Sequence, residues 1–188
     1  MARIEYKNDV TRSLEEAEGS DGRLNVSSRS DERAYYNSRD EGQTYTMTFD
    51  HASAADGQYS FYLQNTSTDK TLVVSSVGLN ATNIARLKLW HVTGTAANGV
   101  ARVPHNTNFA SPNDAAASTA LHDGGGTAIS GLTTGGIEID DIQISANGHD
   151  EFRLLDRLRL GQNDAIALEM DLGTSTPTIF GVIFFYYE

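Results

Sequence analysis

The carboxylates, histidines and hydroxyls of this sequence are the side chains that could do chemistry, and their spacing matches no established catalytic pattern. The best local pair of carboxylates is Asp140-Asp141, which could act in acid–base catalysis or bind Ca²⁺. Neighbouring residues of a strand point to opposite faces of the sheet, so these two could share a site only across a β-bulge. We therefore predict no metal site at this pair.

A glycine-rich turn and a set of histidines are the other candidates for a ligand site. The turn, residues 123–126, reads DGGG and lacks both the alternating carboxylates of an EF-hand loop and the lysine of a phosphate loop. The histidines, which show no HExxH or paired zinc spacing, are His51, His91, His105, His122 and His149. We predict neither a metal nor a cofactor.

Covalent and glycosidic catalysis also lack a sequence signature. There is no GxSxG nucleophile elbow. A glycosidase needs two carboxylates that face each other across a cleft, a geometry that the sequence does not reveal. The aromatic residues that could stack on sugars are Trp90, Tyr59, Tyr62 and Tyr186. Packing in a core or an interface is the simpler interpretation of these side chains, and we predict that the chain is not an enzyme.

Composition excludes several classes of partner. The 188 residues contain no cysteine, so there is no disulfide framework and no thiolate metal site. The net charge of -11 argues against non-specific binding to nucleic acid, which depends on Lys and Arg. No apolar run is long enough to span a bilayer, and the N-terminus MARIEYKNDV lacks the apolar segment of a signal peptide. We expect synthesis in the cytoplasm and no membrane partner.

Short strands separated by turns account for most of the chain. Tyr45, Met47 and Phe49 alternate with threonines, which is typical of a half-buried strand. The strands predicted from such patterns cover residues 43–49, 58–64, 70–77, 84–92, 99–103, 128–132, 136–144, 152–160, 165–172 and 178–188. A break of phase at Asp140-Asp141 predicts a β-bulge, and a bend is expected near Asp156. Short helices are possible over residues 14–18 and 114–121.

This pattern predicts an all-β fold. Turns recur every 8–12 residues without an internal repeat, as in an antiparallel β-sandwich or barrel. The long connection over residues 104–127 and an apolar final strand favour a jelly-roll-like sandwich. A connection of that length is usually functional or an interaction surface. We place this domain at residues 42–188.

The final strand is apolar on both of its faces. Residues 178–188 read TIFGVIFFYYE, a continuous run that predicts a strand covered on both sides. One cover is the opposite sheet, and we expect a second copy of the chain to supply the other. A plain core strand in a monomer is the alternative. We predict a homo-oligomer, in the first instance a trimer, with Phe180, Phe184 and Tyr186 packed between copies.

Residues 1–41 differ from the rest of the chain because they are rich in charge and poor in large apolar side chains. Such a segment does not bury enough apolar surface to fold alone, so it is either a disordered tail or an extended arm that becomes ordered on a partner. We predict the arm. The residues expected to contact the partner are Arg29, Arg33, Tyr35, Tyr36 and Arg39, through bidentate ion pairs and aromatic anchoring.

Three stretches resemble structural proteins of tailed bacteriophages. They are GRLNVSSRSDERAYYNSRDEGQTYTMTFD at 22–50, VPHNTNFASPNDAAASTAL at 103–121 and LRLGQNDAIALEMDLGTSTPTIFGVIFFYYE at 158–188. The resemblance implies a jelly-roll virion protein, either a capsid decoration or cement protein bound to the major capsid protein, or a head or tail fibre component that recognises host-surface glycans. A phage-encoded hydrolase is a further alternative. The resemblance carries no catalytic motif, and the residues before Gly22 match nothing in this group.

Overall fold

The computed structural model describes residues 5–7, 14–16, 38, 42–52, 54–113, 115, 118–122, 128–133, 137–173 and 176–188. The chain divides into two compact units, residues 1–31 and 32–188. In the first unit, β1 (Glu5–Lys7) pairs with β2 (Leu14–Glu16) in an antiparallel ladder. The helix expected from residue 14 is therefore wrong over 14–16, because pairing with a second strand overrides a weak local helix propensity.

The second unit contains the remaining described strands. They are β3 (Thr44–His51), β4 (Tyr59–Asn65), β5 (Leu72–Ala81), β6 (Ala85–Val92), β7 (Val100–Ala101), β8 (His105–Asn106), β9 (Ser118–His122), β10 (Glu138–Ile144), β11 (Gly148–Leu160), β12 (Ala165–Gly173) and β13 (Ile179–Tyr187). The helix expected over 114–121 is wrong from residue 118, where β9 pairs with β4. The strand expected over 128–132 is reduced to isolated bridges at Ser130 and Thr133.

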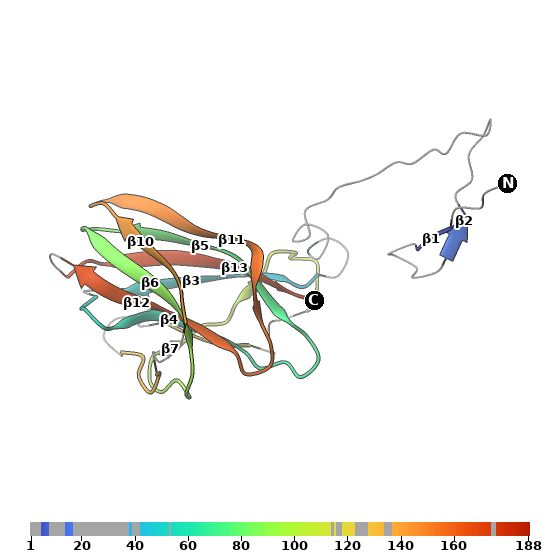
Figure 1. Ribbon diagram of the computed structural model, residues 1–188, viewed down its shortest axis with the longest axis horizontal. Helices are drawn as coiled ribbons and strands as arrows, with labels where there is room; N and C mark the ends of the chain where they lie inside the picture. The colour runs from blue at the N-terminus through green and yellow to red at the C-terminus, as the bar shows by residue number, and fades with distance from the viewer. Residues whose placement is uncertain are drawn as a thin grey trace. The chain divides into compact units, whose positions relative to one another are not determined.

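These strands form two antiparallel sheets that pack face to face (Figure 1). The six-stranded sheet has the order β10-β6-β12-β4-β9-β7, and the five-stranded sheet has the order β11-β5-β13-β3-β8. The long strands pair in a nested way, β3 with β13, β4 with β12, β5 with β11 and β6 with β10. This arrangement confirms the predicted jelly-roll-like β-sandwich.

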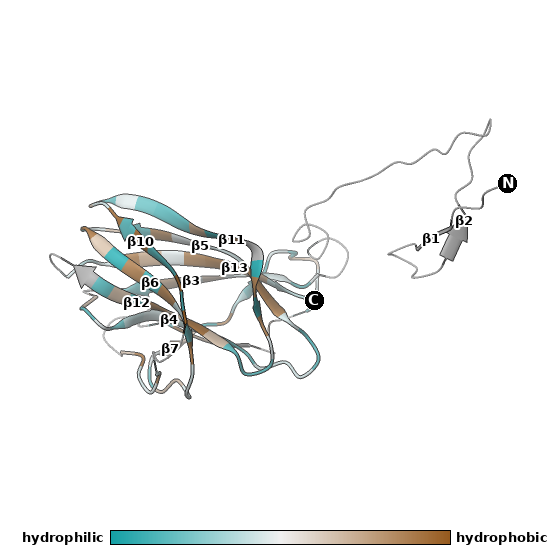
Figure 2. Cartoon of the chain, viewed as in Figure 1, coloured by the Kyte–Doolittle hydropathy of each residue, from teal (hydrophilic) through white to brown (hydrophobic). Residues whose placement is uncertain are grey.

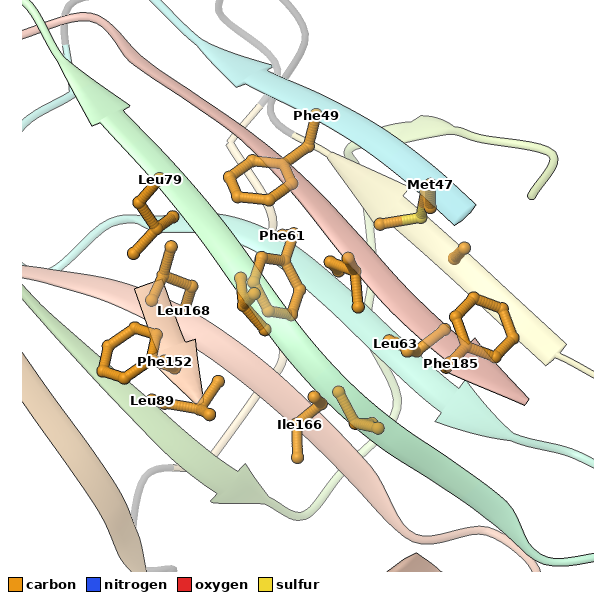
Figure 3. Packing of buried hydrophobic residues seen from close by; sticks show 14 of the residues in the cluster. Met47, Phe49, Phe61, Leu63, Leu79, Leu89, Phe152, Ile166, Leu168 and Phe185 are labelled. Atoms are coloured by element: carbon orange, nitrogen blue, oxygen red, sulfur yellow. The ribbon is translucent and has the colours of Figure 1, made fainter. Parts of the chain in front are cut away.

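The main core lies between the two sheets (Figure 3). The rings of Phe49 and Phe61, from opposite sheets, lie 4.9 Å apart between their centroids. Gly181 is the one small residue in β13, and a Cβ there would overlap the Phe49 ring and approach the carbonyl oxygen of Gly78 to 2.8 Å. Glycine at this position therefore makes room for the aromatic pair in the centre of the sandwich.

Both irregularities expected in the long strands are present. The register of β10 against β6 shifts between Glu138 and Asp140, which confirms the predicted bulge. The register of β11 against β5 shifts between Arg153 and Leu158, where the bend was expected. Figure 2 shows hydrophobic and hydrophilic bands along β6 and β12, as expected for strands with one face toward the core. Within the described ranges, no helix has the length and hydropathy needed to cross a membrane.

Candidate functional site

The outer face of β13 exposes a row of apolar side chains on the five-stranded sheet. Phe180 and Phe184 are 46% and 40% exposed, and Val182 between them is half-buried. We call these three residues the aromatic strip. Their neighbours in the strand, such as Ile183 and Phe185, point to the core and are fully buried. β13 therefore has one face in the sandwich and one open face.

Small and polar residues flank the aromatic strip. The cross-strand neighbours are Thr46 and Ser76 beside Phe184, Thr48 and Gly78 beside Val182, and Asp50 and Asn80 beside Phe180. The carboxylate of Asp50 is held by Arg102 Nη2 at 3.0 Å and by His122 Nδ1 at 3.2 Å. Beyond β5, Glu151 and Arg153 form an ion pair of 3.0 Å. An uncharged centre within a charged rim is the composition of a protein interface.

The three residues expected to pack between copies differ in their exposure. Phe180 and Phe184 lie exposed on one face, as such packing requires. Tyr186 lies on the same face but is 0% exposed, so it offers no surface to a second copy. Strand alternation puts Tyr186 on the outer face, but it does not reveal what buries a residue there. The predicted arm contacts Arg29, Arg33, Tyr35, Tyr36 and Arg39 lie outside the described residues.

The outer face of the six-stranded sheet is covered by the chain's own loops. Tyr62 and Ala167 lie side by side on this face, and Ile129 packs against them from the loop that follows β9. The backbones of the two covering loops bridge at Thr93–Thr133 and Ala97–Ser130. The other residues of this second cluster are Tyr59, Trp90, Val92, Ala96, Leu121, Leu132 and Ala165. Tyr59 and Tyr62 are therefore packed against neighbours and are not open platforms for sugars.

Charged side chains on the same sheet neutralise one another. Lys88 Nζ lies 2.9 Å from Asp171 and 3.7 Å from Glu138. Arg86 Nη1 lies 3.3 Å from Asp171, and its Nε donates to Asp141 at 3.1 Å. Hydrogen bonds to Asp171 and Asp141 raise the pKa of Lys88 and of Arg86 respectively. Because Asp141 is paired with Arg86, the Asp140-Asp141 pair is not a free carboxylate pair for acid–base work or a metal.

Glu169 is the acidic residue with a perturbed pKa in the described part of the chain. Partial burial raises the pKa of its carboxyl, whereas the nearby indole N–H of Trp90 and the charge of Lys88 lower it. Burial has the larger effect, and Asp171 and Asp56 add to it by repulsion. A raised carboxyl pKa suits a general acid, but it is also the ordinary result of placing a carboxyl beside a covered apolar cluster.

A buried serine–histidine pair joins β3 to β4. The amide of Ala55 donates to Gln58 Oε1, which identifies that atom as an acceptor. His51 Nε2, at 3.2 Å from the same oxygen, is therefore the protonated ring nitrogen and donates to it. His51 Nδ1 is then the acceptor for the hydroxyl of Ser60 at 3.1 Å. A nucleophile and its base have this arrangement. Ser60 is 0% exposed, so no substrate reaches it, and the pair serves to connect the two sheets.

The loop after β8 holds the most exposed aromatic residue among those described. Phe109 is 94% exposed, and Val103 just before β8 is also exposed. The length of this connection predicts a functional segment or an interaction surface, but no residue pattern predicts a role for Phe109 itself. The available signal was a lone aromatic residue in a loop of Asn, Ser and Pro, where no strand or helix pattern explains it.

Within the described ranges, no three His, Asp or Glu side chains come together in a way that would hold a metal ion. The glycine-rich turn at 123–126 lies outside these ranges. Comparisons with protein-family models, curated proteins and solved structures find no match to this chain.

Proposed function

We propose that this chain is a non-enzymatic structural protein of a bacteriophage virion, a capsid decoration or cement protein that forms homo-oligomers and binds the shell through its N-terminal arm. The observation that carries this proposal is the pair of exposed rings of Phe180 and Phe184 on a regular sheet face. Exposed apolar patches on a single chain mark sites of interaction. The jelly-roll-like sandwich supports the proposal, because viral capsid domains use this architecture.

The proposed mechanism is mechanical. Each copy contributes a modest apolar contact at the aromatic strip, and the symmetry of the particle multiplies it. Residues 1–41 add contacts to the major capsid protein through charged and aromatic side chains. Three parts of this proposal rest on the sequence resemblance of the stretches described above. They are the bacteriophage source, the shell as partner and the location on the virion.

A fibre component that recognises host glycans is the alternative within the virion. Such a protein would present aromatic rings and polar groups together in an open site. The tyrosines considered for sugar stacking, Tyr59 and Tyr62, are packed in the second cluster. The exposed rings, Phe180 and Phe184, have mostly small neighbours on an open sheet face. This arrangement favours contact with protein over contact with sugar.

The first test asks whether the chain is on the particle. Virions of the phage that encodes it are purified by density gradient, and quantitative mass spectrometry measures its copy number relative to the major capsid protein. We expect a fixed ratio that persists in high salt. Absence of the chain from purified particles contradicts the proposal, and specific binding on a glycan array would favour the fibre alternative.

The second test concerns the arm. Deleting residues 2–37 with Arg39→Gln removes the predicted contacts but keeps Ser38, whose carbonyl and hydroxyl contact the loop after β8. We expect the variant to keep its fold by circular dichroism and to lose binding to particles that lack the protein. Unchanged affinity for these particles would show that the arm is not the attachment element.

A further inference from the structure

Phe109 forms a knob on the surface of the domain. Its side chain is 94% exposed, and the residues around it, from Asn106 to Asn113, carry no charge. A single exposed apolar side chain is ordinary on a protein surface, so a role for Phe109 depends on whether its loop is held in place. The hydrogen bonds of this loop show that it is not free.

The loop that carries Phe109 is tied down at both ends. Three hydrogen bonds join the loop to the residues before β3: Asn106 Nδ2 donates to the carbonyl of Gly42 (2.7 Å), Asn108 Nδ2 to that of Ser38 (2.8 Å), and Ser111 Oγ to that of Gly42 (3.1 Å). Three more lie within the loop: Asn106 Nδ2 donates to the carbonyl of Asn113 (2.8 Å), the Asn108 amide to Asn106 Oδ1 (2.8 Å), and the Ala110 amide to Asn108 Oδ1 (3.1 Å). Gly42 has φ +59°, and a Cβ there would lie 2.7 Å from Cβ of Ser111, so the loop packs closely on the start of the domain. The loop therefore holds Phe109 in place before any partner binds, which lowers the conformational entropy lost on binding.

The spacing of Phe180 and Phe184 along β13 matches the width needed to hold one further ring between them. Phe180 and Phe184 stand on the same face four positions apart, which is about 13 Å along a strand at roughly 3.3 Å per residue. Between them stands the smaller side chain of Val182, whose Cγ1 lies 3.3 Å from the position that a Cβ on Gly78 would take. We call the space above Val182, between the two rings, the gap. Aromatic pairs favour centroid separations of about 4.5–7 Å, so two such contacts on either side of an inserted ring span about 9–14 Å.

We propose that copies of this chain associate head to tail, with Phe109 of one copy inserted between Phe180 and Phe184 of the next. This inference rests on the oligomeric part of the proposed function. A second copy is the occupant because one chain carries both halves of the contact, the knob and the gap. Its own Phe109 does not fill its own gap, since that ring is almost fully exposed. Copies with a net charge of -11 repel, so a contact between them must add little negative charge. The knob and the aromatic strip are uncharged, and the neighbouring Asp50 is held by Arg102 and His122.

A contact between two different surfaces has a consequence that a face-to-face contact lacks. An open chain of copies keeps one unused knob at one end and one unused gap at the other until it closes on itself. A rotation that closes after three steps gives the trimer expected from the sequence. A self-complementary contact between two aromatic strips would instead stop at a dimer and would not involve Phe109.

The experiment uses two full-length variants that each remove one half of the contact. Phe109→Ser removes the knob, and Phe184→Glu blocks the gap with a charge. Light scattering coupled to chromatography, with sedimentation velocity, measures the mass of each variant alone and of an equal mixture. We expect a closed oligomer for the unchanged chain, monomers for each variant, and a dimer for the mixture, because only one intact contact is then available.

Truncation of a buried aromatic anchor typically weakens association roughly 30-fold or more, and we expect a loss of this size for Phe109→Ser. Ile137 is an exposed apolar residue outside both halves, and Ile137→Ser is the matched control that should leave association unchanged. Thermal unfolding of every variant confirms that it is folded.

Three results would overturn the inference: an unchanged oligomer for Phe109→Ser, a mixture that stays monomeric, or an unchanged chain that stays monomeric at high concentration. Binding to particles is measured separately for each variant. A Phe109→Ser variant that stays oligomeric but leaves the particle would place the knob against the shell. This inference would then fail while the proposed function stands.

Discussion

The outer faces of the two sheets differ in how their apolar residues are covered. On the six-stranded sheet, Tyr62 and Ala167 are covered by loop residues such as Ile129, and the surrounding charges pair with one another. On the five-stranded sheet, Phe180 and Phe184 have no such cover in the described part of the chain and remain partly exposed. Both faces come from strands with similar alternation, so strand pattern alone does not distinguish them.

The difference in cover between the two outer faces indicates which face is available for function in a chain without a catalytic motif. A face that is covered by its own loops contributes to the stability of the single chain. A face with exposed rings contributes little to that stability, and its sequence is free to serve a contact with another molecule. Variants on the two faces should therefore affect different measurements.

The largest effect on folding is expected from Tyr62→Ala. Removing this buried ring should lower the free energy of unfolding by about 3–5 kcal/mol, as for other buried aromatic residues. The matched variant Phe184→Ala, on the exposed face, should lower it by roughly 1–2 kcal/mol at most. Urea unfolding at a concentration that keeps the chain monomeric measures both values. Equal losses for the two variants would remove the distinction between the faces.

A smaller effect is expected from uncovering the six-stranded sheet. Ile129→Ala removes most of one covering side chain from a loop and should cost about 2–4 kcal/mol, near the range for buried Ile→Ala changes. The variant should also bind a hydrophobic dye more strongly than the unchanged chain, because the Tyr62 side of the sheet becomes accessible. No change in dye binding together with no change in stability would show that the loop is not a cover.

The smallest effect is expected from Glu169→Gln and depends on pH. Burial raises the pKa of Glu169 above its ordinary value of 4.5, so the folded state binds the proton more tightly than the unfolded state. The stabilising contribution of this group is complete below pH 4.5 and is lost as the pH rises through the raised pKa. The variant should therefore gain stability relative to the unchanged chain between pH 4 and pH 7. Urea midpoints at several pH values test this, and a difference that does not vary with pH contradicts it.

Most of the fold could be predicted from residue patterns. The alternation of Tyr45, Met47 and Phe49 locates β3, and the phase break at Asp140 locates a bulge. These features are local, because a strand with one buried face has a period of two whatever its partner is. The helix expected over 114–121 is wrong from residue 118, because those residues pair with β4. β4 is far away in the sequence, so a local pattern does not reveal this pairing.

The candidate site was harder to predict, because exposure depends on what lies above a sheet. Phe180 and Tyr186 occupy the same face of β13, and only Phe180 is exposed. Nothing in the strand pattern separates them. Phe109 was missed for a different reason, since a single aromatic residue in a loop has no periodicity. Its role becomes visible only when the hydrogen bonds of Asn106 and Asn108 show that the loop is held in place.

The position of β13 in its sheet constrains how the protein is made. This strand is the last described element of the chain, yet it lies between β3 and β5 in the middle of the five-stranded sheet. During synthesis β3 and β5 must wait with open edges until the residues of β13 have been made, and long-range pairing of this kind is slow. Loss of β13 would remove the centre of the sheet, so chains that stop before Ile179 should expose β3 and β5 and aggregate.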